Sequence, residues 1–597
     1  MSLADLRLPL AAAGIDEPDA AFASLFAAAL GDLHREQGGD AADTAAVIAA
    51  ANLASMAVQQ GHACADLAID ESLDVDIDID ALRRSPMVGN GTAPTPLVLA
   101  GTRLYLYRYW RYERQLAARL IELNRPVQDL DIEAAAAIIT QLFPASGDAQ
   151  PDWQKIAAAT AMSRHLCIVS GGPGTGKTTT VVRILAALLR LQPNLRIAIA
   201  APTGKAAARL KSSITSQLDA LDLPDALRAQ LPAEAHTLHR LLGYRPNRAG
   251  FRHDASQPLP YQLVVVDEAS MLDLALAAKL VAALPADARL ILLGDKDQLA
   301  SVEAGAVYAE LSSRSLLDAA GRATLQRIAG DLPAVPIDAS GYAMANAVVW
   351  LNRAWRFADD GGISRLATAI NAGQPQAVRE VLAAGSASLA WRSALPSPPL
   401  LAATLAQGYE PFIHAVRSAA SPAEVLSSFE RYRVLCSTRA GAYGSESLNR
   451  HLTAQLQRRL GGMAGGARWY AGRAVMVAGN DYALRLFNGD IGVALPDTEG
   501  RLLVYFAGDD GLRAFAPGRL ANVATAFALT VHKAQGSEFA RIDLVIEPTL
   551  ARGLTRELLY TAVTRAREHI GLWCGEELFD TMVATRLRRR SSIIGAT

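Results

Sequence analysis

The chain has 597 residues, of which 51% are apolar and 20% are charged, and its formal net charge at pH 7 is −1. This length predicts several domains, and the composition excludes an intrinsically disordered chain. A near-neutral charge excludes a global basic field, so any nucleic-acid contact must come from a local groove.

The cysteines and the apolar runs narrow the class of protein further. The four cysteines are scattered, at Cys64, Cys167, Cys436 and Cys574. Their spacing argues against a zinc site, an iron–sulfur cluster or a disulfide framework, and it predicts a reducing, cytoplasmic location. The N-terminus lacks the basic and apolar regions of a signal peptide. No uninterrupted apolar run reaches the length of a membrane span, so no membrane contact is expected.

The first 125 residues are predicted to form a separate, mainly helical module. Apolar spacing predicts helices over 22–33 and 42–60, and residues 97–106 are predicted to form a β-hairpin that turns at Gly101. Tyr, Trp and Arg interleave over 105–112, a pattern that suits base stacking and hairpin-to-helix packing equally. The module has no catalytic constellation, so we expect a docking role.

A glycine-rich loop between a predicted strand and a predicted helix carries the main chemical signal. The short apolar run 166–169 predicts a buried strand, and residues 179–191 have helical spacing. Between them lies the pattern G-x-x-x-x-G-K-[ST], whose backbone N–H groups and helix N-terminus bind the phosphates of ATP. Its residues are Gly171, Gly172, Pro173, Gly174, Thr175, Gly176, Lys177 and Thr178, followed by Thr179. Lys177 is expected to reach the β- and γ-phosphates, and Thr178 to bind Mg²⁺.

Two further apolar strands are predicted to end in polar groups. After the run 262–266, Asp267 is expected to hold Mg²⁺ through its water shell, and Glu268 to orient and deprotonate the attacking water. After the run 289–293, Gln298 is expected to sense the γ-phosphate. Functional residues at the carboxyl ends of three strands predict an open parallel α/β sheet.

Other polar turns have two interpretations each. Gln154 precedes the loop by one helix, where its amide could read the adenine edge or simply lie on the surface at a helix start. Thr203 follows the predicted strand 197–201 and can hold a phosphate of a nucleic-acid strand. Residues 244–261 are rich in Pro, Gly, Arg and Asn, and they predict a projecting loop or small hairpin.

The second half of the chain predicts another α/β domain. Residues 315–345 have weak periodicity with several Gly and Pro, which predicts a linker. Short predicted strands with tight turns over 472–507 indicate a small inserted β-barrel. On a predicted helix, Arg565 could stabilise the transferring γ-phosphoryl group across a domain cleft, or it could form a surface ion pair of little value.

The ordered motifs resemble those of superfamily 1 helicases, in the branch that moves 5′ to 3′ on DNA. Within that branch, residues 150–568 are most similar to the RecD family, the alpha subunits of RecBCD-type enzymes (exodeoxyribonuclease V). The resemblance is carried by 152–182, 264–272, 294–304, 481–493, 525–539 and 557–567. It implies an α/β fold with two RecA-like P-loop motor domains, ATP between them, and a small SH3-like β-barrel insertion.

The resemblance also implies boundaries and residue roles. The implied parts are an N-terminal docking module, 1–125; a first motor domain, 126–335, with a hairpin near 244–261; and a second, 336–597, with the insertion near 458–522. Gln154 is implied as the adenine reader, and Arg356 and Arg565 as the arginines supplied across the cleft. Residues in motifs that usually contact single-stranded DNA are Thr203, Lys205, Thr237, His239, Thr530, His532, Lys533 and Gln535.

The function implied is an ATP-dependent 5′-to-3′ DNA helicase subunit, with ATP and Mg²⁺, that acts on double-strand break ends beside RecB-like and RecC-like partners. One alternative is a stand-alone RecD-like helicase, which usually has a longer N-terminal extension. Another is a nuclease, although no carboxylate cluster outside the ATPase motifs predicts a two-metal site. A third is a scaffold with an inactive ATPase, against which the intact motifs argue.

Overall fold

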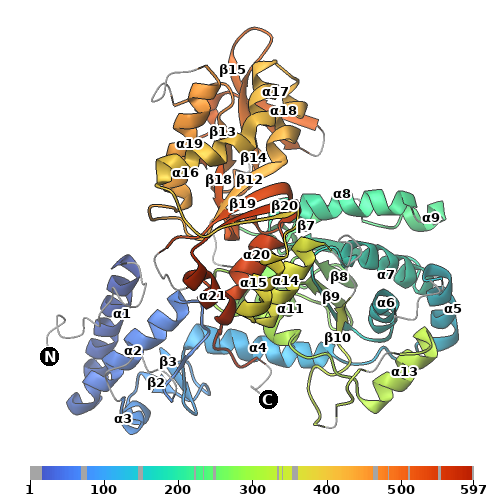
Figure 1. Ribbon diagram of the computed structural model, residues 1–597. Helices are drawn as coiled ribbons and strands as arrows, with labels where there is room; N and C mark the ends of the chain where they lie inside the picture. Colours follow the sequence, from blue (N-terminus) through green and yellow to red (C-terminus); the bar gives the residue numbers. More distant parts are fainter. Residues whose placement is uncertain are drawn as a thin grey trace.

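In the residues that it describes, the computed structural model of the chain forms four β-sheets surrounded by helices (Figure 1). The described residues are 17–68, 77–144, 152–220, 224–232, 234–245, 250–332, 335–338, 340–352, 361–461, 468–481, 483–508, 511–548 and 553–593.

The first large sheet has six strands, all paired in parallel, in the order β10-β5-β9-β8-β6-β7. Its strands are β5 (Leu166–Gly171), β6 (Ile197–Ala201), β7 (Ala235–Thr237), β8 (Leu263–Val266), β9 (Arg289–Gly294) and β10 (Val348–Leu351). Helices cover both faces, which is why the central strands are nearly continuous apolar runs. This confirms the open parallel sheet that the strand ends predict.

The helices that follow or flank these strands complete the first of two α/β parts, which we name the first and second motor parts after the motor domains that the resemblance implies. They are α5 (Ile132–Leu142), α6 (Trp153–Ser163), α7 (Lys177–Leu191), α8 (Gly204–Ala220), α9 (Asp225–Arg228), α10 (Leu238–Leu241), α11 (Leu274–Ala282), α12 (Val307–Leu311) and α13 (Ala319–Ala329).

The predicted linker over 315–345 is wrong, because α13 lies within it. Asp318 caps this helix by accepting a hydrogen bond from the Gly321 N–H at 2.6 Å. Leu325 and Ile328 are buried against the sheet's helices. Strand β10 then pairs with β5, so the first sheet extends past residue 335, where the sequence placed the domain boundary.

The second large sheet has five parallel strands in the order β11-β20-β19-β12-β18. They are β11 (Leu389–Arg392), β12 (Tyr432–Cys436), β18 (Ala528–Thr530), β19 (Phe539–Val545) and β20 (Ala566–Trp573). Its helices are α14 (Gly362–Ala372), α15 (Pro375–Ala383), α16 (Pro398–Leu405), α17 (Glu410–Arg417), α18 (Pro422–Glu430), α19 (Ser445–Arg459), α20 (Arg556–Val563) and α21 (Glu576–Ala584). A second parallel α/β part is therefore confirmed.

Between β12 and β18 the chain inserts a small antiparallel sheet in the order β16-β15-β14-β13-β17. The strands are β13 (Ala474–Val477), β14 (Ile491–Pro496), β15 (Leu502–Gly508), β16 (Gly511–Phe515) and β17 (Val523–Thr525). Alternate residues of β13 face two cores, since Val475 packs within this sheet and Ala474 packs on the second motor part. Among the described pairings, the end strands β16 and β17 do not meet.

The N-terminal part combines helices with a four-stranded sheet, β1-β4-β3-β2. Its elements are α1 (Glu17–Glu36), α2 (Thr44–Gln59), β1 (Ala65–Asp66), α3 (Ile79–Arg84), β2 (Val88–Gly89), β3 (Leu97–Ala100) and β4 (Arg103–Leu106). The predicted hairpin is confirmed, and Gly101 turns it with φ 64°. The next helix, α4 (Tyr107–Leu123), packs on α11 and shares the core of the first sheet.

One helical segment, Ala41–Gln59, is long and apolar enough to cross a membrane, contrary to the expectation from the sequence. Its apolar residues, however, form the core of the N-terminal part. Val47, Ala50 and Ala54 are almost completely buried against neighbours that include Leu30 of α1. The segment therefore packs as the core helix of a folded domain does.

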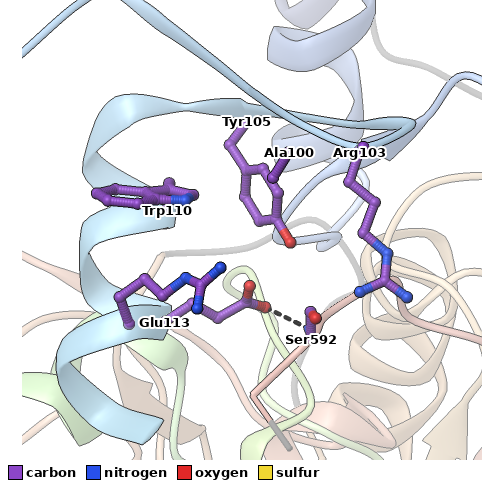
Figure 2. A pocket seen from close by; sticks show the side chains of 8 residues that line it. Ala100, Arg103, Tyr105, Trp110, Glu113 and Ser592 are labelled. Atoms are coloured by element: carbon purple, nitrogen blue, oxygen red, sulfur yellow. Dashed lines mark hydrogen bonds between the residues drawn. The ribbon is translucent and has the colours of Figure 1, made fainter. Parts of the chain in front are cut away.

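After α21 the chain returns to the N-terminal part. The Arg590 N–H donates to Nδ1 of His62 at 3.0 Å, and the Ser592 N–H donates to Oε1 of Glu113 at 2.7 Å (Figure 2). Ile593 is 1% exposed and completes the core beneath α4. Residues 585–593 thus connect the second motor part to the first sheet and to the N-terminal part.

Candidate functional site

The phosphate loop connects β5 to α7, as predicted. Gly174 and Gly176 have φ values of 77° and 81°, a left-handed conformation that glycine adopts without strain. Gly176 caps α7, so the helix N-terminus points its free N–H groups and positive dipole end into the loop. Local sequence therefore creates an anion-binding cradle.

The Lys177 ammonium lies over this loop. Its Nζ donates to the carbonyl oxygens of Gly171 at 2.5 Å and Gly172 at 3.1 Å. Thr178 begins α7 beside it, half-buried. The Thr179 hydroxyl instead donates to Gln217 Oε1 of α8 at 3.3 Å.

Gln154 lies at the loop, not on the surface. It is the second residue of α6, whose cap Asp152 accepts from the Gln154 N–H at 3.0 Å. Its side chain is buried, and Nε2 donates to the Thr175 carbonyl at 3.3 Å. The interpretation as a surface residue is wrong, and an amide next to the phosphate loop suits the predicted adenine contact.

Asp267 and Glu268 follow β8 at the same edge of the sheet. The Asp267 N–H donates to the Ala200 carbonyl at 2.9 Å, which continues the pairing of β8 with β6. Glu268 has φ 52°, a left-handed conformation unusual outside glycine, and its N–H donates to Asp267 Oδ1 at 2.8 Å. The backbone thus turns sharply where the two carboxylates are needed.

The charge on Asp267 is disfavoured by its surroundings. Burial raises the pKa of Asp267, and the Glu268 carboxylate raises it further, while the Lys177 ammonium opposes the shift. A hard cation would relieve this repulsion. The carboxylate of Asp267 and the hydroxyl of Thr178 are oxygen donors of the kind that Mg²⁺ prefers, so the residues present fit that ion.

Gln298 lies in the turn that follows β9. Its Nε2 donates to Asp295 Oδ2 at 3.0 Å, and the Lys296 N–H donates to the Ser170 hydroxyl at 3.2 Å, just before the phosphate loop. Asp295, which the sequence motifs do not single out, lies at the same edge and holds Gln298. It follows β9 directly, as Asp267 follows β8, and that position could have identified it.

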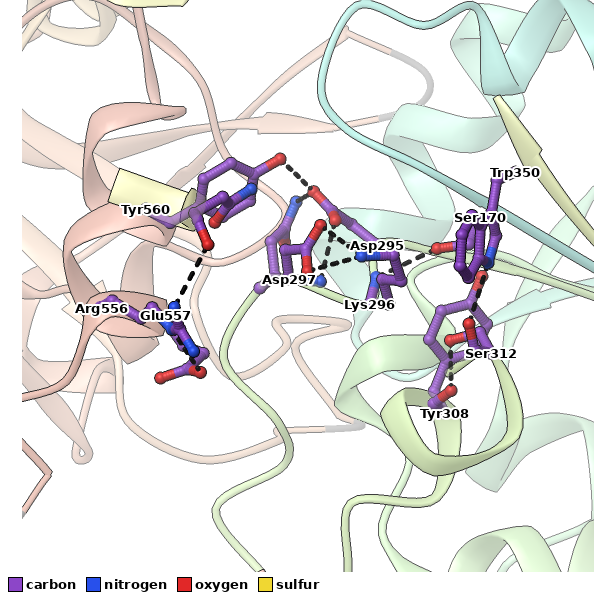
Figure 3. A network of polar contacts seen from close by, with 12 residues as sticks. Ser170, Asp295, Lys296, Asp297, Tyr308, Ser312, Trp350, Arg556, Glu557 and Tyr560 are labelled. Carbon is purple, nitrogen blue, oxygen red and sulfur yellow. Dashed lines mark hydrogen bonds and ion pairs between the residues drawn. The ribbon is translucent and has the colours of Figure 1, made fainter. Parts of the chain in front are cut away.

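Asp295 also meets the second motor part. The Tyr560 hydroxyl, on α20, donates to Asp295 Oδ2 at 2.9 Å (Figure 3). Burial raises the pKa of Asp295, and the donated hydrogen bond from Tyr560 partly offsets this. The turn that carries Gln298 is therefore in direct contact with α20.

The two predicted cleft arginines have different outcomes. Arg356 lies outside the described residues. Arg565 is 3% exposed, so its interpretation as a surface ion pair is wrong. It follows α20, and its guanidinium donates to the carbonyls of Thr561 at 3.0 Å and Ser537 at 3.2 Å, both in its own half of the molecule.

Two of the predicted DNA contacts lie where β6 leads into α8. Thr203 accepts a hydrogen bond from the Ala206 N–H at 3.2 Å, which orders the start of α8. Lys205 is half-buried, with Nζ 6.0 Å from the centre of the Phe539 ring in β19, and burial lowers its pKa to about 8. Lys205 therefore faces the second motor part.

Thr237 and His239 lie at the predicted projecting hairpin. Thr237 caps α10 by accepting from the Arg240 N–H at 3.2 Å. The His239 ring makes edge contacts with Tyr244 and Phe251, which pair across the hairpin as an isolated bridge. The exposed rings of His239 and Tyr244 and the half-buried ring of Phe251 form an aromatic cluster beside α10.

The four predicted contacts after β18 divide into exposed and buried groups. Lys533 is exposed, and its N–H donates to the Thr530 hydroxyl at 3.4 Å. His532 is half-buried, and burial lowers its pKa. Gln535 is 7% exposed, and its Nε2 donates to the Leu299 carbonyl at 3.0 Å. The Gln535 side chain thus joins the two motor parts in this structure, and its predicted DNA contact stays a prediction.

Fold and site together define an ATP-binding motor of the helicase class. Residues 154–304 match the AAA domain family, and residues 525–573 match the UvrD-like helicase C-terminal domain family. The Pif1 helicase from Candida albicans is a structural neighbour with TM-score 0.40 and 14% identity, covering 75% of this chain and 98% of that one.

Two curated relatives specify the family. The RecBCD enzyme subunit RecD of Mycolicibacterium smegmatis is 38% identical over 549 residues, which cover 88% of this chain and 89% of that protein. The ATP-dependent RecD2 DNA helicase of Deinococcus radiodurans is 32% identical over 446 residues, which cover 71% of this chain and 51% of that protein. The chain belongs to the RecD family.

Replacing Glu268 by Gln should uncouple binding from hydrolysis. The amide keeps the shape but cannot accept the water proton, so we expect the steady-state ATPase rate to fall by about 10²–10⁴-fold. Affinity for a fluorescent ATP analogue should stay within about twofold. Asp287→Asn is the control, because that side chain is 91% exposed and precedes β9 at the opposite edge of the sheet. A Glu268→Gln rate near that of the unmodified chain would contradict the assignment.

Proposed function

We propose that the chain is an ATP-dependent 5′-to-3′ DNA helicase, the RecD-like subunit of a cytoplasmic RecBCD-type helicase–nuclease that acts on double-strand break ends in recombinational repair. The observation that carries the proposal is the meeting of two parallel sheets at one polar edge. Lys177, Asp267 and Gln298 lie on one side of this edge, and Tyr560 of α20 contacts Asp295 across it.

The residues of this edge divide the chemistry of ATP hydrolysis among them. The loop N–H groups and Lys177 bind the phosphates, and Gln154 binds the adenine edge. Thr178 and Asp267 would hold Mg²⁺, which neutralises phosphate charge when bound. Glu268 orients a water and accepts its proton, and Gln298 contacts the γ-phosphate.

Hydrolysis is coupled to motion because both motor parts contact the same phosphate. Arg356 and Arg565 are proposed to contact the γ-phosphate from the second part, although in this structure Arg565 donates to carbonyls of its own half. Loss of the phosphate removes those contacts and separates the two parts. Alternating grip on the DNA backbone then gives directional steps that tolerate any sequence.

The DNA-binding surface in this proposal uses the whole predicted set. Thr203, Lys205, Thr237 and His239 belong to the first motor part, and Thr530, His532, Lys533 and the buried Gln535 belong to the second. The division into a docking module and two motor domains, and the SH3-like character of the small sheet, belong to the same proposal.

The subunit interpretation is favoured over a stand-alone helicase. The match covers 89% of the Mycolicibacterium RecD but only 51% of the Deinococcus RecD2. Nuclease activity is expected of the complex only. The proposed partners are RecB-like and RecC-like subunits in a heterotrimer, as the names of the RecD relatives suggest.

The N-terminal part offers a surface for such partners. On α1, Phe22 is 61% exposed, Leu25 is 69% exposed and Leu33 is 40% exposed. The helical spacing of Phe22 and Leu25 places them on one face, where together they expose apolar surface to solvent. We propose that this face of α1 docks a partner subunit.

The helicase proposal is tested by strand displacement on duplexes with a 5′ or a 3′ single-stranded tail. We expect DNA-stimulated ATPase, and unwinding from the 5′ tail only, by the purified chain or its complex. Lys177→Gln should abolish both activities, because it removes the ammonium that binds the phosphates. Unwinding from the 3′ tail would contradict the polarity, and absence of ATPase would contradict the motor.

The docking proposal is tested by Leu25→Asp combined with Phe22→Asp. Burying two carboxylates at an apolar interface should weaken co-purification with co-expressed RecB-like and RecC-like subunits by at least tenfold, on the order of 1.4 kcal/mol or more. DNA-stimulated ATPase of the free chain should change by less than about twofold. Leu512→Asp, at a 43% exposed site on β16, is the matched control. Full co-purification of the double variant would exclude this face.

A further inference from the structure

The turn that carries Gln298 is held by three hydrogen bonds from the second motor part. Tyr560 donates to Asp295 Oδ2 at 2.9 Å, and the Leu299 N–H donates to the Thr561 hydroxyl at 2.8 Å. Gln535 Nε2 donates to the Leu299 carbonyl at 3.0 Å. The five residues that form these hydrogen bonds are each at most 7% exposed, so water does not compete for the contacts.

Asp295 connects this junction to the predicted γ-phosphate sensor. Its Oδ2 accepts from both the Tyr560 hydroxyl and Gln298 Nε2, and its Oδ1 accepts from the Asp297 N–H at 3.1 Å. One carboxylate oxygen therefore sets the position of a side chain from each motor part. If α20 moves away, Asp295 loses one donor and Gln298 loses a fixed partner.

The Tyr560 hydroxyl also lies against the phosphate loop. A Cβ added at Gly172 would come within 2.9 Å of that hydroxyl oxygen. No positive φ is required of Gly172, so its lack of a side chain serves this close approach rather than a turn. Tyr560 thus contacts the loop and the sensor turn at the same time.

We propose that Tyr560 is a positioning residue that couples docking of the second motor part to the orientation of Gln298. Its hydroxyl holds Asp295 Oδ2 only when α20 lies at the first sheet, and Asp295 then holds the Gln298 amide toward the γ-phosphate. Hydrolysis is fast when the two parts are docked and slow when they are apart. The inference rests on the proposed function, because it assumes that DNA binding favours docking.

Tyr560→Phe removes the hydroxyl and keeps the ring, so it tests the coupling in the full chain or its complex. With saturating single-stranded DNA, kcat for ATP should fall roughly tenfold, the size expected for one hydrogen bond to a charged group. Without DNA, kcat should stay within about twofold, as should the Kd for a fluorescent ATP analogue. An equal fall in both rates, or weaker nucleotide binding, would indicate a merely structural role and overturn the proposal.

The control variant is Tyr409→Phe. Tyr409 is 1% exposed and donates to the Phe527 carbonyl inside the core of the second motor part. This substitution also removes a buried tyrosine hydroxyl from the second motor part, but at a place away from the junction. Tyr409→Phe should keep DNA-stimulated kcat within about twofold, and a loss equal to that of Tyr560→Phe would overturn the proposal.

Epistasis provides a second test that a structural role would not reproduce. Gly172→Ala should slow DNA-stimulated hydrolysis, because its methyl group meets the Tyr560 hydroxyl. In the Tyr560→Phe background it should add little, and Asp295→Asn should likewise add less than its effect alone. If the effects of the two substitutions on the DNA-stimulated rate multiply in a double variant, the proposal is overturned. If DNA does not stimulate ATP hydrolysis by the unmodified chain, the proposed function fails. If DNA stimulates hydrolysis by the unmodified chain and by Tyr560→Phe equally, only this inference fails.

Discussion

The hydrogen bond from Tyr560 to Asp295 joins two parallel sheets at the edge where their functional residues lie. Parallel strands present their carboxyl ends on one edge, so Asp267 and Asp295 meet the phosphate loop there without any long-range design. The second sheet must then come to that edge to complete the site. In Figure 1, α20 lies between the first sheet and the second, and the insertion with β13–β15 projects away from them.

Burial at the junction has an electrostatic consequence. The pKa values of Asp267 and Asp295 are raised by desolvation, so their carboxylates depend on nearby positive groups and hydrogen-bond donors. Lys177 opposes the shift at both. Low polarity also strengthens each charge–dipole contact at the junction.

The local chemistry could be predicted from the sequence, because it depends on short motifs. The phosphate loop, the pair Asp267 and Glu268, and the turn with Gln298 all follow apolar strands, and the structure places them at one edge. The hairpin that turns at Gly101 was also predictable, since alternation and a turn residue define it.

The remaining features depend on contacts between distant segments. Asp295 and Tyr560 are 265 residues apart, and no spacing in the chain indicates that they meet. The hydrogen bond from Gln535 to the Leu299 carbonyl likewise joins residues that are 236 positions apart, so no local pattern predicts it. Helix α13 was missed because a single cap at Asp318 and a few buried residues stabilise it, in a stretch with weak periodicity.

We propose that the γ-phosphate state sets the distance between the two motor parts. The most direct test is fluorescence energy transfer between dyes on cysteines introduced at Ala323 of α13 and Ser418 after α17, both exposed, because the four natural cysteines are buried. We predict two distinct transfer efficiencies, one with a non-hydrolysable ATP analogue and single-stranded DNA, and another with ADP. The Lys177→Gln variant should show a single transfer efficiency with both nucleotides. The same efficiency with both nucleotides in the unmodified chain would contradict the account.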